Sequence, residues 1–242
     1  MIVPICIGMP RSASRMTWQL VKQLSPPEPD WWQDRMSIDA PGARVENPRD
    51  SPWPHRSHNY VSGNDPVIYT YRNPVEAYLS FLSRVSPVIV WRPDRTAVNE
   101  ILQHVLTQRK LRMDRGAARN VLWLRYEDYF GDDRRRLDTI MEFMGVTRSA
   151  AEQERILEYV SLSTNRARSK DIPSNIDDAI AFHKCENTTT GIQGHHINEA
   201  TQGRVGAYIN NYPDEVSRIR SARSNEPLGE LRLFAESLGY AV

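Results

Sequence analysis

The stretch from Ile2 to Leu24 constrains this chain most, because it combines an apolar strand, a tight turn and a helix. Its first residues form a short, nearly continuous apolar run that is typical of a buried parallel strand, and the run stops at Gly8-Met9-Pro10. A helix is predicted from Met16 to about Leu24. The free backbone N–H groups of its first turn would point back at the loop between strand and helix, which is the geometry of an anion site. The sequence therefore predicts a phosphate-binding unit within an α/β fold.

The loop between this strand and helix carries small side chains, hydroxyls and guanidinium groups that suit an anion. The residues predicted to bind it are Arg11, Ser12, Ala13, Ser14 and Arg15. The common nucleoside-triphosphate loop, G-x-x-x-x-G-K-[ST], needs a second glycine and a lysine, and this loop has Ser14 and Arg15 in their place. A phosphate site of another kind is therefore expected. The alternative, a turn whose arginines only face solvent, stays open at this point.

The composition limits the classes of protein to which the chain can belong. With 242 residues, 40% of them hydrophobic, the chain can bury one sizeable core, and we expect one domain over residues 1–242. A net charge of +1 excludes a global field for nucleic acid, so any anion site must be local. No stretch is typical of a signal peptide or a membrane span, and two cysteines are too few for a disulfide framework. We therefore expect a cytoplasmic protein with no membrane or nucleic-acid partner.

A second candidate anion site follows the apolar run Val67–Tyr71. This run is predicted to be a strand, and it ends at Arg72-Asn73-Pro74, where Pro74 suits the first turn of a helix. Ser80 lies eight positions after Arg72 and two turns into that helix. An arginine at a strand end and a serine at this spacing can converge on one phosphate, the first with a guanidinium fork and the second with a hydroxyl.

Further strands and helices are predicted along the chain. Val121–Arg125 is expected to be a buried strand, and a helix is expected from Asp133 to Met144, with Gly145 as its C-terminal stop. Arg134, Arg135 and Arg136 are interpreted as a solvated face of that helix. Other helices are expected over residues 99–116 and 152–160, and two more over residues 214–239. His183, Cys185, His195 and His196 match no compact zinc pattern, so no metal is expected.

Several of these motifs, in this order, resemble those of the sulfotransferase family. The string P-R-S-A-S-R resembles the family's 5′-phosphosulfate loop, with Ala13 where glycine is commoner. The string R-N-P-V-E followed by Ser80 resembles its 3′-phosphate motif, and L-R-Y-E-D-Y resembles the segment whose tyrosine contacts adenine. The string G-R-V-G-A-Y from Gly203 resembles a loop that closes over the 3′-phosphate, although Thr201 and Gln202 stand where an Arg-Lys pair is expected.

This resemblance implies a P-loop-like, three-layer α/β/α sandwich around a parallel sheet. It implies 3′-phosphoadenosine 5′-phosphosulfate (PAPS) as sulfuryl donor and 3′-phosphoadenosine 5′-phosphate (PAP) as product, with no metal. The implied nucleotide contacts are the 5′ loop from Arg11 to Arg15, then Arg72 and Ser80, Tyr126, and finally Gly203 and Arg204. Arg11 is also expected to act in catalysis, as a fixed charge.

The general base is expected to be a histidine or a carboxylate near the 5′ loop. Arg56-Ser57-His58 resembles the family's Lys-(Thr/Ser)-His at a strand end, so His58 is the candidate and His55 the reserve. The acceptor is expected to be the hydroxyl, less often the amine, of a small molecule, glycan or peptide, and the oligomeric state stays open. Two other classes remain: a P-loop kinase, which would need the missing lysine, and an inactive nucleotide-binding interaction protein, suggested by Ala13, Thr201 and Gln202.

Overall fold

A computed structural model describes the parts of the chain that carry most of these motifs. The described residues are 3–26, 56–57, 60, 64–82, 93–115, 120–161, 163–164 and 205–242. Within them the chain alternates strands and helices, so the predicted α/β class is confirmed.

A parallel sheet lies at the centre of the molecule. Within the described residues it has four strands in the order β2-β1-β3-β4, all paired in parallel. The strands are β1 (Ile5–Gly8), β2 (Arg56–Ser57), β3 (Val67–Tyr71) and β4 (Val121–Arg125). The predicted bounds of β3 and β4 are confirmed, but the prediction that β4 is buried was wrong, because only Leu124 in it is buried and the strand lies at the end of the described sheet. Because all strands run in one direction, the loops that follow β1, β3 and β4 meet at one edge of the sheet.

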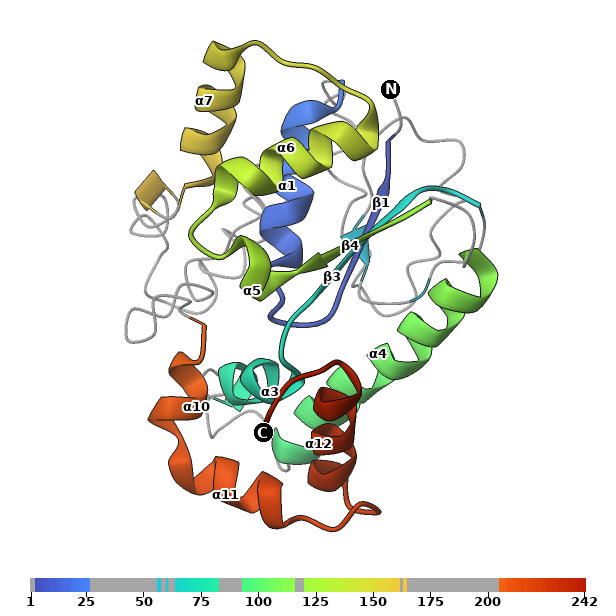
Figure 1. Ribbon diagram of the computed structural model, residues 1–242, viewed down its shortest axis with the longest axis vertical. Coiled ribbons are helices and arrows are strands. Elements are labelled where there is room, and N and C mark those ends of the chain that lie inside the picture. Colours follow the sequence, from blue (N-terminus) through green and yellow to red (C-terminus); the bar gives the residue numbers. More distant parts are fainter. Residues whose placement is uncertain are drawn as a thin grey trace, which may run out of the picture.

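Helices cover both faces of the sheet, which confirms the three-layer sandwich. On one face, α1 (Ser14–Leu24) and α6 (Asp133–Met144) pack with Cys6, Ile68 and Leu124, and α7 (Ala150–Val160) joins them (Figure 1). On the other face, Leu111 of α4 (Pro93–Arg115) packs against Ile7 and Tyr69. Both faces of a parallel sheet are thus buried, as its apolar strands require.

A third group of helices lies beyond the carboxyl ends of the strands (Figure 1). It consists of α3 (Pro74–Leu82), α10 (Ala207–Asn211), α11 (Pro213–Ser221) and α12 (Pro227–Ser237). These helices share one hydrophobic core, which includes Tyr78, Leu231 and Phe234. Met9, just before the 5′ loop, belongs to the same core. The short helix α5 (Tyr126–Tyr129) follows β4 directly. None of the described helices is long and apolar enough to cross a membrane.

Local signals set the helix ends. Asp132 caps α6 through a hydrogen bond from the Arg135 backbone N–H, and Gly145 ends the helix in the left-handed conformation, as predicted. Helix α7 starts at Ala150, two residues before the predicted start. Ser149 and Glu152 form a reciprocal capping box there. Helix α4 begins at Pro93 and not at Asn99, because its first turn is polar and gives no apolar period.

Candidate nucleotide-binding site

The loop after β1 adopts the strained backbone that an anion-binding loop needs. Arg11 and Ala13 both have positive φ, 65° and 61°, although neither is glycine. Such left-handed residues cost free energy and gather at functional sites. Gly8 at the end of β1 has no room for a side chain, since an added Cβ would lie 2.1 Å from the Ser14 Cβ and 2.4 Å from Thr70 Oγ1. The start of α1 therefore packs directly on the ends of β1 and β3.

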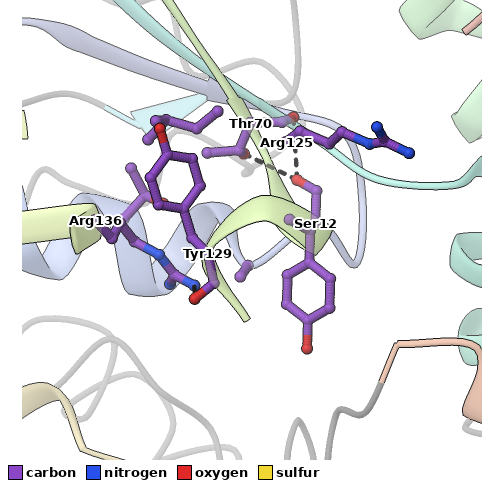
Figure 2. A pocket seen from close by; sticks show the side chains of 9 residues that line it. Ser12, Thr70, Arg125, Tyr129 and Arg136 are labelled. Carbon is purple, nitrogen blue, oxygen red and sulfur yellow. Dashed lines mark hydrogen bonds between the residues drawn. The ribbon is translucent and has the colours of Figure 1, made fainter. Parts of the chain in front are cut away.

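The Ser12 hydroxyl fixes this loop from within. It donates to the Met9 carbonyl oxygen at 2.6 Å and lies 2.8 Å from Thr70 Oγ1 on β3 (Figure 2). The Ser12 backbone N–H also turns back to the Met9 carbonyl, at 3.2 Å. The residue is buried, so in this structure its hydroxyl holds the loop against β3 and does not face solvent.

Arg72, directly after β3, lies buried between two aromatic rings. Its guanidinium carbon is 4.5 Å from the centre of the Tyr126 ring and 6.0 Å from that of Tyr208. Nη2 donates to Glu76 Oε2 at 2.9 Å, and Nη1 donates to the Arg11 carbonyl at 3.2 Å. Among the described residues Nε has no hydrogen-bond partner. A buried guanidinium with an unused donor, only 3% exposed, is suited to a further acceptor such as a phosphate oxygen.

Glu76 connects Arg72 to the helix that follows the predicted 3′-phosphate loop. Its Oε1 accepts the backbone N–H of Ile209 in α10 at 3.0 Å, while Oε2 holds Arg72. Burial raises the pKa of Glu76, against the lowering effects of the Ile209 N–H and of Arg72. Glu76 thus fixes α10, with Tyr208 on it, beside Arg72.

The predicted 5′ and 3′ residues are in direct contact. Arg11 Nε donates to the Ser80 hydroxyl at 3.1 Å, and the Arg11 carbonyl accepts from Arg72. Ser80 is buried on α3, two turns after Pro74. Two guanidinium groups and a hydroxyl therefore gather at the carboxyl ends of β1 and β3.

Glu127 ties this region to the end of the chain. Its Oε1 accepts the backbone N–H of Asn73 at 2.8 Å, and its Oε2 accepts the hydroxyl of Tyr240 at 2.8 Å. Tyr240 in turn accepts from Arg125 Nε at 3.0 Å. The Asn73 side chain caps α3, because its Oδ1 accepts the Val75 N–H at 2.9 Å. The backbone that carries Arg72 is therefore held from two sides.

A small cavity opens beside the 5′ loop. Its lining includes Ser12 and Ala13 from the loop, Tyr126 from α5 and Arg136 from α6 (Figure 2). The interpretation of Arg136 as part of a solvated face was wrong, since the residue is only 4% exposed. The helical period explains this, because Arg136, Ile140 and Met144 are spaced four residues apart and all three are buried. Arg134 and Arg135 are more exposed, and Arg134 pairs with Glu154.

Some predicted site residues lie outside the described part of the chain. These are His58, His55, Gly203, Arg204 and the side chain of Arg15. His183, Cys185, His195 and His196, which were not predicted to bind a metal, also lie outside it. Of the others, the structure brings Arg11, Arg72, Ser80 and Tyr126 together. Sequence reasoning missed Glu76, Glu127 and Tyr240. Glu76 follows Arg72 by one helical turn, and that spacing was the available signal. Nothing in the sequence links Tyr240 to Glu127.

Comparisons with known proteins agree with this geometry. A sequence model described as the sulfotransferase domain matches residues 46–208, a range that includes β3 and β4 but not the 5′ loop. The fold is similar to that of the mouse sulfotransferase SULT7A1 complexed with PAP, at a TM-score of 0.56 and 18% sequence identity. That alignment covers 98% of this chain and 89% of the mouse chain. No curated protein sequence matches this chain significantly.

Proposed function

The chain belongs to the sulfotransferase family, and we propose that it transfers the sulfuryl group of PAPS to a hydroxyl of its acceptor. PAPS carries phosphate at both its 3′ and 5′ positions, so an enzyme that uses it needs two anion sites at nucleotide spacing. The cofactor proposal includes PAP as product and no metal.

The contact of the 5′ loop with the 3′ motif is the observation that supports this donor best. Arg11 reaches Ser80 at 3.1 Å, and Arg72 reaches the Arg11 carbonyl at 3.2 Å. Among the described residues Glu76 is the carboxylate that pairs with Arg72, and Arg11 brings a second guanidinium group to the same place. We propose that Arg72 and Ser80 bind the 3′-phosphate and that Arg11, released from Ser80, binds the 5′-phosphosulfate together with the loop from Ser12 to Arg15.

The proposed reaction is an in-line transfer. The acceptor oxygen attacks sulfur, the bond between sulfur and the bridging oxygen of the 5′-phosphate breaks, and PAP leaves with the electron pair of that bond. The acceptor proton passes to the base. Such a step depends on positioning and on stabilising the charge of the leaving oxygen, as phosphoryl transfer does. Arg11 suits that second task, because a guanidinium keeps its charge at every working pH.

We propose His58 as the base, with His55 as reserve. Strand β2 ends at Ser57, which pairs with Ile7 on β1, one residue before Gly8. His58 is the next residue in the sequence, and neighbouring strand ends in an open α/β sheet face one crevice. Tyr126 is proposed to contact adenine, and Gly203 and Arg204 to close over the 3′-phosphate.

The experiment that tests the function is a turnover assay with PAPS labelled in its sulfuryl group, run over a set of hydroxyl and amine acceptors and read by mass spectrometry. His58→Ala should lower turnover about 10² to 10⁴-fold and leave PAP affinity nearly unchanged. Arg11→Ala should lower it strongly, and Arg11→Lys less. PAP binding without turnover on any acceptor would favour the inactive interaction protein. Transfer of a phosphoryl group from ATP would favour the kinase, although the loop lacks its lysine.

The acceptor is a small molecule, glycan or peptide with a hydroxyl group, and no nucleic acid or membrane partner is proposed. We propose that residues 1–242 form one domain and that the protein acts in the cytoplasm. The oligomeric state stays open.

A further inference from the structure

Arg136 is the buried charged residue in the cavity that the family motifs leave without a role. It comes from the first turn of α6 and lines the cavity together with the 5′ loop and Tyr126 (Figure 2). Its guanidinium ends beside the backbone carbonyl of Tyr129, whereas that of Arg125 lies on the other side of the view (Figure 2). Arg136 therefore lines the same cavity as the 5′ loop and Tyr126.

The contacts of Arg136 are weak for a buried cation. Nη1 lies 3.0 Å from the thioether sulfur of Met16, which is a weak acceptor, and Nη2 donates to the Tyr129 carbonyl at 3.3 Å. The carboxylate of Asp133 is 3.7 Å away, beyond hydrogen-bond distance, and is itself partly exposed. Burial lowers the pKa of Arg136, which reflects the cost of holding its charge in this place.

The position of Arg136 is also unfavourable for stability. The first turn of a helix carries a partial positive charge, so a cation there opposes the helix dipole of α6. The N-terminal turn of α1, another partial positive charge, lines the same cavity through Ala13 and Thr17. Replacing a poorly compensated buried charge by an apolar side chain of similar length is often neutral or stabilising. A residue that costs stability where it stands is a candidate for ligand binding.

We propose that Arg136 binds the adenine of the donor nucleotide, by donating its N–H groups to the ring nitrogens of the base. This inference rests on the proposed function, in which Tyr126 contacts adenine, and Tyr126 lines the same cavity as Arg136. A purine has hydrogen-bond acceptors on its edge and a π-face above its ring. A guanidinium group can donate to the acceptors and can stack on the face. In this arrangement the edge of the base lies at the mouth of the small cavity beside the 5′ loop, while Arg11 and Arg72 hold the phosphates.

The test compares two ligands by calorimetry: PAP, and an abasic analogue with the same two phosphates on a 1-deoxyribose ring. Arg136→Met should weaken PAP binding about tenfold or more and leave binding of the abasic analogue unchanged. Arg136→Lys keeps the charge and loses the planar fork, so it should lose part of the preference for PAP. Arg135→Met, at the neighbouring and exposed position, should leave both affinities unchanged.

The outcomes separate the possible roles of Arg136. Equal weakening of both ligands would assign it to a phosphate and overturn the base assignment. An unchanged preference for PAP in a folded variant would also overturn it. If Arg136→Met does not fold, Arg136→Lys decides instead, through the ratio of its affinities for PAP and for the abasic analogue. Failure of the wild-type chain to bind either ligand would instead overturn the proposed function itself.

Discussion

Replacing Ala13 by glycine should stabilise this protein, although glycine usually destabilises. Ala13 has a φ of 61°, in the left-handed region, where a side chain costs about 1–2 kcal/mol. Glycine removes that cost, but it also loses more backbone entropy on folding than alanine does, which destabilises the folded state by roughly 0.4–1 kcal/mol. The net gain in the free energy of unfolding should therefore reach about 1 kcal/mol, the difference between these two ranges. For a chain of this size that gain raises Tm by about 2–4 °C.

The measurement is urea unfolding of the wild type, Ala13→Gly and a matched control. Ala151→Gly is the control, because Ala151 is exposed in the first turns of α7 and has no positive φ. It should lose roughly 0.5–1 kcal/mol. The slope of the unfolding free energy against urea should stay the same in all three proteins. If Ala13→Gly lost as much stability as Ala151→Gly, the left-handed strain in the 5′ loop would not exist.

Two further changes test the supports of the site. Tyr240→Phe removes the hydroxyl that accepts from Arg125 and donates to Glu127, and should cost about 1–3 kcal/mol in urea unfolding; an unchanged midpoint would mean that this link carries no stability. Burial raises the pKa of Glu76 in the folded protein, because the buried site disfavours the charged carboxylate. The stability that the protonated side chain contributes is therefore fully present below the ordinary pKa of the group and is lost as the pH rises through the raised pKa. The stability of the wild type relative to Glu76→Gln should therefore fall with pH above about 4.5. A relative stability that rises over that window would contradict this sign.

The strands could be predicted from the sequence because local signals define them. Val67–Tyr71 is a short apolar run of the kind that a parallel strand buried on both faces needs. Val121–Arg125 is a similar run, although only Leu124 within it is buried. The placement of Arg72 and Ser80 at the same end of the sheet also follows from spacing, since a strand end and the helix after it have fixed lengths. The short helix Ala207–Asn211 could not be predicted, because five residues give no helical period.

The missed site residues depend on contacts between distant segments. Tyr240 reaches Glu127 across 113 positions of sequence, and no periodic pattern encodes such a pair. Arg136 was misread because it follows two other arginines, and a run of charges usually marks a solvated face. The period of α6 carried the correct signal, since Arg136 shares a stripe with Ile140 and Met144.

The most direct test of the donor assignment is the preference of the protein for PAP over AMP, which differ by the 3′-phosphate alone. Calorimetry should give at least about tenfold tighter binding of PAP, because Arg72 and Ser80 add charge-assisted contacts worth about 1.5–3 kcal/mol. Arg72→Met, which keeps a side chain between the rings of Tyr126 and Tyr208, should abolish this preference. Arg218→Met, at an exposed ion pair on α11, should keep it. Equal affinity of the wild-type protein for PAP and AMP would contradict the account.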